Sequence, residues 1–174
     1  MERIVEMISK KMEKALNEQI NAEMYSANLY LSMESYFRSR NLNGFAVWMR
    51  VQVQEEMMHA TKIYDFVNER SGRVILKSIA APQSEWKSPL AVFEATYKHE
   101  QKVTGLINEL VNMAVKEKDH ATNVFLQWFV SEQVEEESSA EKIVQHLKMI
   151  EKTPAGILML DRELGQRVFK PAAS

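Results

Sequence analysis

The chain has 174 residues, 45% of them hydrophobic, which fits one domain, spanning residues 1–174, that can bury a substantial core. Its formal net charge of -2 and isoelectric point near 6.1 argue against a nucleic-acid-binding surface, so we expect no nucleic-acid partner. With no cysteine, the chain has no disulfide, no thiolate metal site and no thiol nucleophile.

The first residues, MERIVEMISKKMEKALNEQ, alternate charged and apolar side chains and lack the continuous apolar core of a signal peptide. No later stretch approaches the roughly 20 apolar residues that a membrane-spanning helix needs. We therefore expect a cytoplasmic protein with no membrane partner.

Glycine and proline are few and clustered, so the long segments between them are predicted to be helical. The first predicted helix runs from about residue 4 to residue 38. Asn43 is the expected N-cap of the second, which ends at the stretch RSGR. Gly72 in that stretch is expected to adopt the left-handed conformation that often follows a helix.

A long connection follows, closed by Ser88 as N-cap and Pro89 at the first position of the third helix. This helix is predicted to end near residue 118. Asp119 can cap a fourth helix that continues to about residue 151, and a short fifth helix is predicted over residues 156–168. The predicted fold is all-α: a four-helix bundle over about residues 4–151, with a long crossover between helices 2 and 3.

Each long predicted helix carries an apolar stripe that a carboxylate interrupts near the midpoint. In an antiparallel bundle the helix midpoints share one layer, so we expect these side chains to meet. The interrupting residues are Glu23 in the first helix, Glu56 with His59 in the second, Glu100 in the third, and Glu132 with Glu136 in the fourth.

Burying several carboxylates together costs several kcal/mol for each ion, and their repulsion adds to that cost. The four negative charges of Glu23, Glu56, Glu100 and Glu136 would balance two divalent cations, while neutral His59 adds one nitrogen ligand. Oxygen-rich ligation with one imidazole and no sulfur suits iron or manganese better than structural zinc. The sequence therefore predicts a centre with two metal ions.

These motifs resemble the ferritin-like di-iron family, in which two helices each supply one glutamate and two supply Glu-x-x-His. Here EEMMH provides Glu56-x-x-His59, whereas in SEQVEEE Glu132 is followed three residues later by Glu135. Because the second histidine is missing, the chain is more similar to the non-haem ferritins of bacteria and archaea than to bacterioferritins.

The resemblance implies roles for individual residues. Glu23, Glu56 and His59 would hold the first iron of a ferroxidase centre. Glu56, as a bridge, would hold the second iron together with Glu100 and Glu136.

The resemblance also implies a third, weaker iron site. Its ligands would be Glu55, Glu132, Glu135 and Glu136. Gln133 would lie close to the second iron, and Tyr30 and Trp128 resemble aromatic residues that supply or relay electrons.

The implied function is oxidation of Fe(II) by oxygen or peroxide, followed by storage as a ferric mineral. In the family this happens inside a hollow homo-oligomer of twenty-four subunits, with the last helix lining a channel at the four-fold axis.

Other functions stay open at this point. A bacterioferritin-like protein would bind haem through Met57, for which packing is the default role. Another di-iron oxidase would act on an organic substrate, for which the small chain leaves little room. A metal-free helical module would have to bury several carboxylates without a cation, which is costly. A mini-ferritin is disfavoured because that type divides its metal ligands between subunits, whereas one chain supplies them all here.

Overall fold

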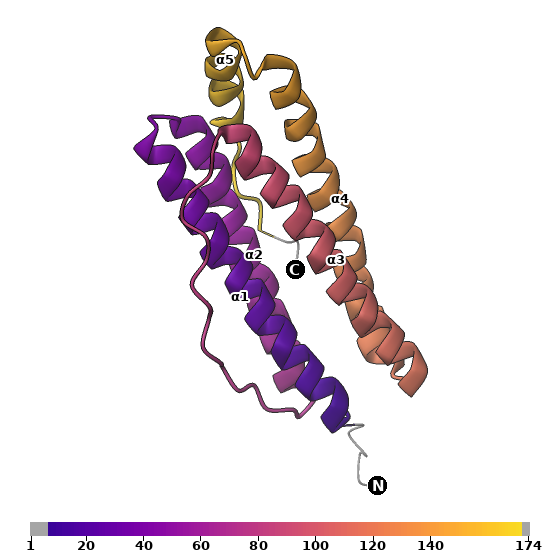
Figure 1. Ribbon diagram of the computed structural model, residues 1–174. Helices are drawn as coiled ribbons and strands as arrows, with labels where there is room; N and C mark the ends of the chain where they lie inside the picture. Colours follow the sequence, from indigo (N-terminus) through magenta and orange to yellow (C-terminus); the bar gives the residue numbers. More distant parts are fainter. Residues whose placement is uncertain (1–6, 172–174) are drawn as a thin grey trace, which may run out of the picture.

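The computed structural model describes residues 7–171, and within this range every regular element is an α-helix. The helices are α1 (Lys10–Ser39), α2 (Asn43–Glu69), α3 (Pro89–Glu117), α4 (His120–Ile150) and α5 (Pro154–Leu164). Figure 1 shows α1 and α2 as one antiparallel pair beside a second pair, α3 and α4, with α5 at one end. The predicted four-helix bundle with a short fifth helix is confirmed. None of these helices is long and apolar enough to cross a membrane.

The predicted crossover is also confirmed, since the segment between α2 and α3 runs the length of the bundle along α1 (Figure 1). Side chains of α1 hold its backbone in place. The Asn17 amide accepts a hydrogen bond from Ile75 N at 2.7 Å and donates to Arg73 O at 3.0 Å. Ser32 Oγ donates to Gln83 O at 2.7 Å. The segment is therefore an ordered strap.

Two predicted N-caps are present. Ser88 Oγ accepts a hydrogen bond from Ala91 N at 3.1 Å at the start of α3. Asp119 Oδ1 accepts one from Thr122 N at 3.1 Å at the start of α4. Both side chains satisfy backbone N–H groups that the first turn of a helix leaves without partners.

Two predicted end residues of α2 were wrong. The N-cap is Leu42, and Asn43 is already the first helical residue. At the other end Ser71, not Gly72, takes the left-handed conformation, with φ 57°. A Cβ atom on Gly72 would lie 3.0 Å from Val67 O, so glycine serves close packing at this position.

The first and last helices have different bounds from those predicted. Ser9 caps α1, so the helix begins at Lys10, while residues 4–6 of the predicted helix lie outside the described part. Helix α5 begins two residues earlier than predicted because Pro154 occupies its first position, where a proline N–H is not needed. It ends at Leu164, and Val168 is exposed beyond it.

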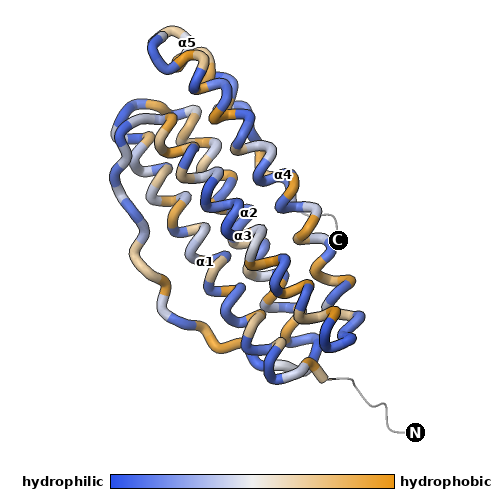
Figure 2. Tube along the Cα trace, turned by 45° about the vertical axis from the view of Figure 1, so that its right-hand side comes forward, coloured by the Kyte–Doolittle hydropathy of each residue, from blue (hydrophilic) through white to orange (hydrophobic). Residues whose placement is uncertain are grey.

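The buried apolar residues form two clusters at opposite ends of the bundle. Figure 2 shows hydrophobic and hydrophilic stretches alternating along each helix, as one-sided burial requires. We call the clusters the α5-end core, which includes Phe37, Phe45, Phe93, Leu147 and Leu160, and the turn-end core, which includes Leu16, Ile63, Ile107, Leu126 and Phe129.

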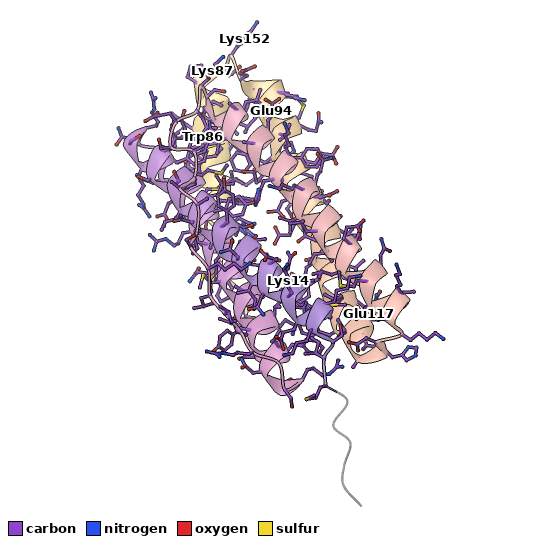
Figure 3. The ribbon with its side chains drawn as sticks, turned by 60° about the horizontal axis from the view of Figure 1, so that its bottom comes forward. Lys14, Trp86, Lys87, Glu94, Glu117 and Lys152 are labelled. Carbon is purple, nitrogen blue, oxygen red and sulfur yellow. The ribbon has the colours of Figure 1, made fainter. Side chains whose placement is uncertain are left out.

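The strap contributes Trp86 to the α5-end core. Figure 3 labels Trp86 and Lys87 near the end of the bundle at which α3 begins, and Lys14 and Glu117 near the opposite end. The predicted metal ligands lie between these ends, near the middle of their helices.

Candidate metal centre

Four glutamates and one histidine from four helices are buried in the layer between the two cores. Each of the five is between 1% and 6% exposed, so water cannot supply the solvation that their charges need. The residues are Glu23 of α1, Glu56 and His59 of α2, Glu100 of α3 and Glu136 of α4.

Their possible ligand atoms form two sets that share one residue. One oxygen each from Glu23 and Glu56 and a nitrogen of His59 lie within 4.8 Å of one another, and so do oxygens of Glu56, Glu100 and Glu136. The resemblance to the ferritin-like family implies the same two groupings, with Glu56 in both. Two adjacent cations could be held here by one shared carboxylate.

Within the first set, His59 Nδ1 lies 3.4 Å from Glu56 Oε2 and 3.9 Å from Glu23 Oε2. Several buried atoms of this set lack a hydrogen bond. Among residues 7–171, the buried side-chain atoms without a hydrogen-bond partner are Glu23 Oε2, Glu56 Oε1, His59 Nε2 and Trp86 Nε1. Three of these atoms belong to the cluster, and lone pairs on oxygen and nitrogen are what a cation would satisfy.

Outer residues hold the other carboxylate oxygens. Gln19 Nε2 donates to Glu23 Oε1 at 2.7 Å. Gln52 Nε2 donates to Glu136 Oε2 at 2.9 Å. Such bonds fix the direction in which each carboxylate presents its second oxygen. Sequence reasoning did not assign these glutamines, although Gln52 stands on the inward stripe of α2 and Gln19 lies one turn before Glu23.

Gln133, expected near the second iron, and Tyr30, expected to supply or relay electrons, both contact Glu100. The Tyr30 hydroxyl donates to Glu100 Oε1, and Gln133 Nε2 donates to Glu100 Oε2 at 3.2 Å. Both side chains are buried. Trp128 lies edge-on to His59, with ring centroids 5.5 Å apart. The three residues thus surround the predicted centre.

Burial dominates the acid–base behaviour of the cluster in the absence of metal. It raises the pKa of Glu100 to about 7, against the hydrogen bonds from Tyr30 and Gln133. Burial and the charge of Glu100 raise the pKa of Glu136 to about 8 and that of Glu56 well above its usual range. These carboxyls would hold protons near neutral pH until a cation replaced them.

The pKa values of two further groups, Tyr30 and His59, are also raised. Burial and the charge of Glu100 raise the pKa of Tyr30, which keeps its hydroxyl proton in place. Burial alone would lower the pKa of His59, but Glu132 and Glu56 raise it more, so the ring would be protonated without metal. A bound cation would remove that proton, because a metal ligand must offer a free lone pair.

Glu34, on the same stripe of α1, shows how the bundle treats a buried carboxylate that needs no metal. Arg38 Nε lies 2.8 Å from one of its oxygens and Arg50 Nε 2.6 Å from the other. Burial would raise its pKa, but these two arginines lower it. Within the described part of the chain, no lysine or arginine pairs in this way with the four clustered glutamates.

The residues expected to form a third site are only partly brought together. Glu132 and Glu136 form a possible ligand group with His59. Glu55 instead accepts a hydrogen bond from Arg167 Nη2 at 2.6 Å, and the Glu135 side chain is exposed. This contact was not predicted, because Arg167 was expected inside the fifth helix, whereas that helix ends at Leu164.

Met57 and the other three histidines belong to none of the possible ligand groups among residues 7–171. Met57, the candidate haem ligand, is 41% exposed. His120 and His146 are exposed. His99 is partly buried, and its Nε2 lies 2.8 Å from Ser26 Oγ. These positions leave the five central residues as the candidate centre.

Sequence comparisons give relatives for nearly the whole chain. A family model described as the ferritin-like domain matches residues 13–150. A bacterial non-heme ferritin from Bacteroides fragilis is 48% identical over 161 residues, which cover 92% of this chain and 100% of the relative. A bacterial non-heme ferritin from Campylobacter jejuni is 44% identical over 156 residues, covering 90% and 93%.

Solved structures with a similar fold are also ferritins. A closed form of Archaeoglobus fulgidus ferritin, engineered by site-directed mutagenesis, has 61% sequence identity and a TM-score of 0.93, covering 94% of this chain and 99% of that one. An open-pore ferritin from the same archaeon has 60% identity and a TM-score of 0.92, covering 92% and 98%. Family match, sequence identity and shared fold agree, and the chain belongs to the ferritin family.

Proposed function

We propose that this protein oxidises Fe(II) at the buried cluster and stores the product as a ferric mineral. One observation carries the proposal: four buried carboxylates from four helices form two ligand sets that share Glu56, and among residues 7–171 no lysine or arginine pairs with them. Buried Glu34 nearby does have such cations, so the fold supplies them where a carboxylate is structural.

The residues divide the work as follows. Glu23 and His59 would bind the first iron, Glu100 and Glu136 the second, and Glu56 both. Two Fe(II) ions side by side supply electrons together to oxygen or peroxide. Gln19, Gln52 and Gln133 orient the carboxylates, while the flanking apolar cores limit the access of water.

The change in charge on oxidation favours release of the Fe(III) product. Four carboxylates balance two divalent ions, but two Fe(III) ions carry six positive charges. Once oxygen has taken up the two electrons and two protons from solvent and left as hydrogen peroxide, oxidation leaves an excess of two. In a buried layer such an excess is costly. Release of iron toward a mineral phase relieves it, which is what a storage protein needs.

Storage further requires a container. The relatives above are named ferritins, which supports a homo-oligomeric cage, and we propose twenty-four subunits and a cytoplasmic location. Helix α5 has exposed Leu158 and Met159, apolar side chains that contacts between subunits would cover. The last helix would then line a channel at the four-fold axis.

The competing proposal of a di-iron oxidase acting on an organic substrate has less support. A surface cavity of about 480 Å³ is lined by residues that include Tyr25, His99 and Lys102. None of the five central residues lines it, so an organic molecule held there would not reach the predicted irons.

The test is aerobic addition of Fe(II) to wild type, Glu56→Gln and the control Glu109→Gln, whose glutamate is exposed on α3. We expect the control to match wild type. Glu56→Gln should oxidise iron at least about a hundredfold more slowly, the upper end of the cost of losing even an outer-shell partner. Ferric absorbance measures the rate, and light scattering measures the assembly.

A wild-type protein that oxidises iron no faster than buffer, or that remains a small oligomer after iron loading, would contradict the proposal. So would a Glu56→Gln protein with the wild-type rate. Haem is tested in the same samples, since a Soret band would reveal it.

A further inference from the structure

The segment that follows α5 turns back along the bundle and brings Arg167 to α2 (Figure 1). Arg167 Nη2 donates to Glu55 Oε2 and to Gln52 Oε1, both at 2.6 Å. Arg167 Nη1 donates to Trp48 O at 3.2 Å, and the guanidinium carbon lies 4.3 Å from the centre of the Trp48 ring. One cation thus holds three successive turns of α2.

This contact differs from an ordinary surface ion pair. The side chains of Arg167 and Glu55 are only 22% and 21% exposed. The guanidinium makes three hydrogen bonds and stacks on an indole ring, an arrangement that suits its planar set of donors. Solvent screening, which makes exposed pairs weak, is reduced here. The position of Arg167 is therefore set by several partners at once.

Gln52 connects Arg167 to the predicted centre. Its amide oxygen accepts from Arg167, while its amide nitrogen donates to Glu136 Oε2 at 2.9 Å. An amide has one accepting and one donating end. Because Arg167 holds the accepting end, the donating end must face Glu136. Arg167 thereby fixes one oxygen of a predicted iron ligand through a single intermediate side chain.

We propose that Arg167 is a built-in cation that takes the place of a third metal ion beside Glu55 and positions Glu136 through Gln52. The proposal rests on the proposed function, since it concerns the surroundings of the same iron pair. The guanidinium stays charged at every physiological pH and repels a metal ion approaching Glu55. A metal ion can use Glu55 only after the C-terminal segment has moved away.

The proposal predicts how many ions each chain binds. Mn²⁺ is added without oxygen to the assembled protein, and the free ion is counted by its paramagnetic resonance signal. Wild type should bind two ions per chain tightly. Arg167→Gln should bind a third, at least tenfold tighter than any third ion of wild type. The control Arg162→Gln, with an exposed arginine on α5, should behave as wild type.

Two Glu55 variants locate the extra ion. Adding Glu55→Gln to Arg167→Gln should return the count to two, whereas Glu55→Gln alone should leave the wild-type count unchanged. This single variant also decides the matter if Arg167→Gln fails to fold, because a lower count would show that Glu55 already binds metal in wild type.

Three other results would overturn the proposal: a third tight ion in wild type, an unchanged count in a folded Arg167→Gln protein, or a third ion that persists in the double variant. The proposed function is tested separately by the first two ions. If wild type binds fewer than two, the predicted iron pair itself is refuted, and the role of Arg167 with it. If two bind and Arg167→Gln changes nothing, only the role of Arg167 is refuted.

Discussion

Tyr30 is the residue whose surroundings most directly suggest a part in the chemistry beyond binding. It is fully buried, its hydroxyl donates to Glu100, and burial raises its pKa, so the proton stays on the phenol. A phenol at this position can lose an electron and a proton together, passing the proton to the carboxylate it contacts. A purely structural tyrosine would need only the packing of its ring.

Tyr30→Phe separates these two roles. We expect the variant to bind two Mn²⁺ ions per chain as wild type does, because the ring remains and the ligands are intact. Iron oxidation should slow by about tenfold to a hundredfold, the usual cost of losing an outer-shell partner. Stopped-flow absorbance after mixing with Fe(II) and oxygen measures the rate.

Tyr36→Phe is the matched control, since Tyr36 is buried in α1 but packs on Phe37 and Trp86. It should oxidise iron at the wild-type rate. Equal rates in wild type and both variants would show that the Tyr30 hydroxyl has no part in oxidation.

Among single residues, sequence periodicity predicted those that lie on an inward stripe. Glu23, Glu56 and Glu100 interrupt apolar stripes, and the structure brings them together. The helix phase in α4 was harder to assign, because inward Gln133 and half-buried Glu132 are neighbours that differ by only about 100° on the helix. Arg167 could not be found, since its contacts depend on the path of a non-helical segment.

At the scale of elements, α5 supports the start of α2. The N-cap of α2, Leu42, has no side chain that can accept a hydrogen bond. Asp161 of α5 replaces it, since its Oδ1 accepts from Phe45 N at 2.9 Å. The carboxylate also lies at the positive end of the helix dipole. The two helices approach so closely that a Cβ on Gly44 would be 1.6 Å from Asp161 O.

Gly44→Ala should therefore force α5 away from α2. We expect a loss of stability of about 1 to 3 kcal/mol, the usual cost of overpacking. Amide hydrogens of α5 should also exchange faster, because the helix loses its contact surface. Hydrogen exchange read by mass spectrometry, together with thermal unfolding, measures both effects.

Gly105→Ala is the control within the same chain. Gly105 lies in α3, and a Cβ there would meet nothing within 4 Å. This variant should gain about 0.5 to 1 kcal/mol, because alanine favours a helix more than glycine does. A Gly44→Ala protein as stable as the control would show that α5 is not held in the described position.

The start of a helix could be predicted from the sequence where its N-cap is a side chain of the same turn. Ser88 and Asp119 were predicted on that basis and act as caps. The start of α2 could not be predicted in this way, because its cap comes from Asp161, more than a hundred residues later. Tertiary contacts that replace a local signal leave no local trace in the sequence.

At the scale of the whole molecule, the buried carboxyls make the metal-free protein sensitive to alkali. The pKa values of Glu100 and Glu136 are raised to about 7 and about 8, above the ordinary carboxyl value. Between about pH 4.5 and pH 8 the native state therefore binds more protons than the unfolded state, and the free energy of unfolding falls as the pH rises. Glu34 has a lowered pKa, so it changes the free energy of unfolding only at more acidic pH.

We accordingly expect the thermal midpoint of the metal-free protein to fall from pH 5 to pH 8. The free energy of unfolding should fall by at least about 2 kcal/mol over this range, because a pKa raised by one unit is worth about 1.4 kcal/mol and two carboxyls are raised by more than that. With Mn²⁺ bound the fall should disappear, because the ions hold the carboxylates deprotonated. Calorimetry of samples with chelator and with Mn²⁺ measures both curves. A metal-free midpoint that rises over this range would contradict the proposed burial of charge.

The overall architecture was predictable because helix patterns, sparse glycine and one long connection together allow few arrangements. The crossover follows from the length of the strap, and the central layer follows from the stripes. The return of the C-terminal segment along α2 does not follow from either, since it depends on the contacts that Arg167 makes.

The division of the apolar core into an α5-end core and a turn-end core has a consequence for cooperativity. Each core draws on all four long helices, but the layer between them consists of buried polar side chains that add little apolar contact when no metal is bound. Native-state hydrogen exchange of the metal-free protein should therefore resolve two opening units with different free energies. A metal ion pair bound at the predicted centre would join four helices at the boundary and should merge the two units into one, so that iron would also connect the halves of the core.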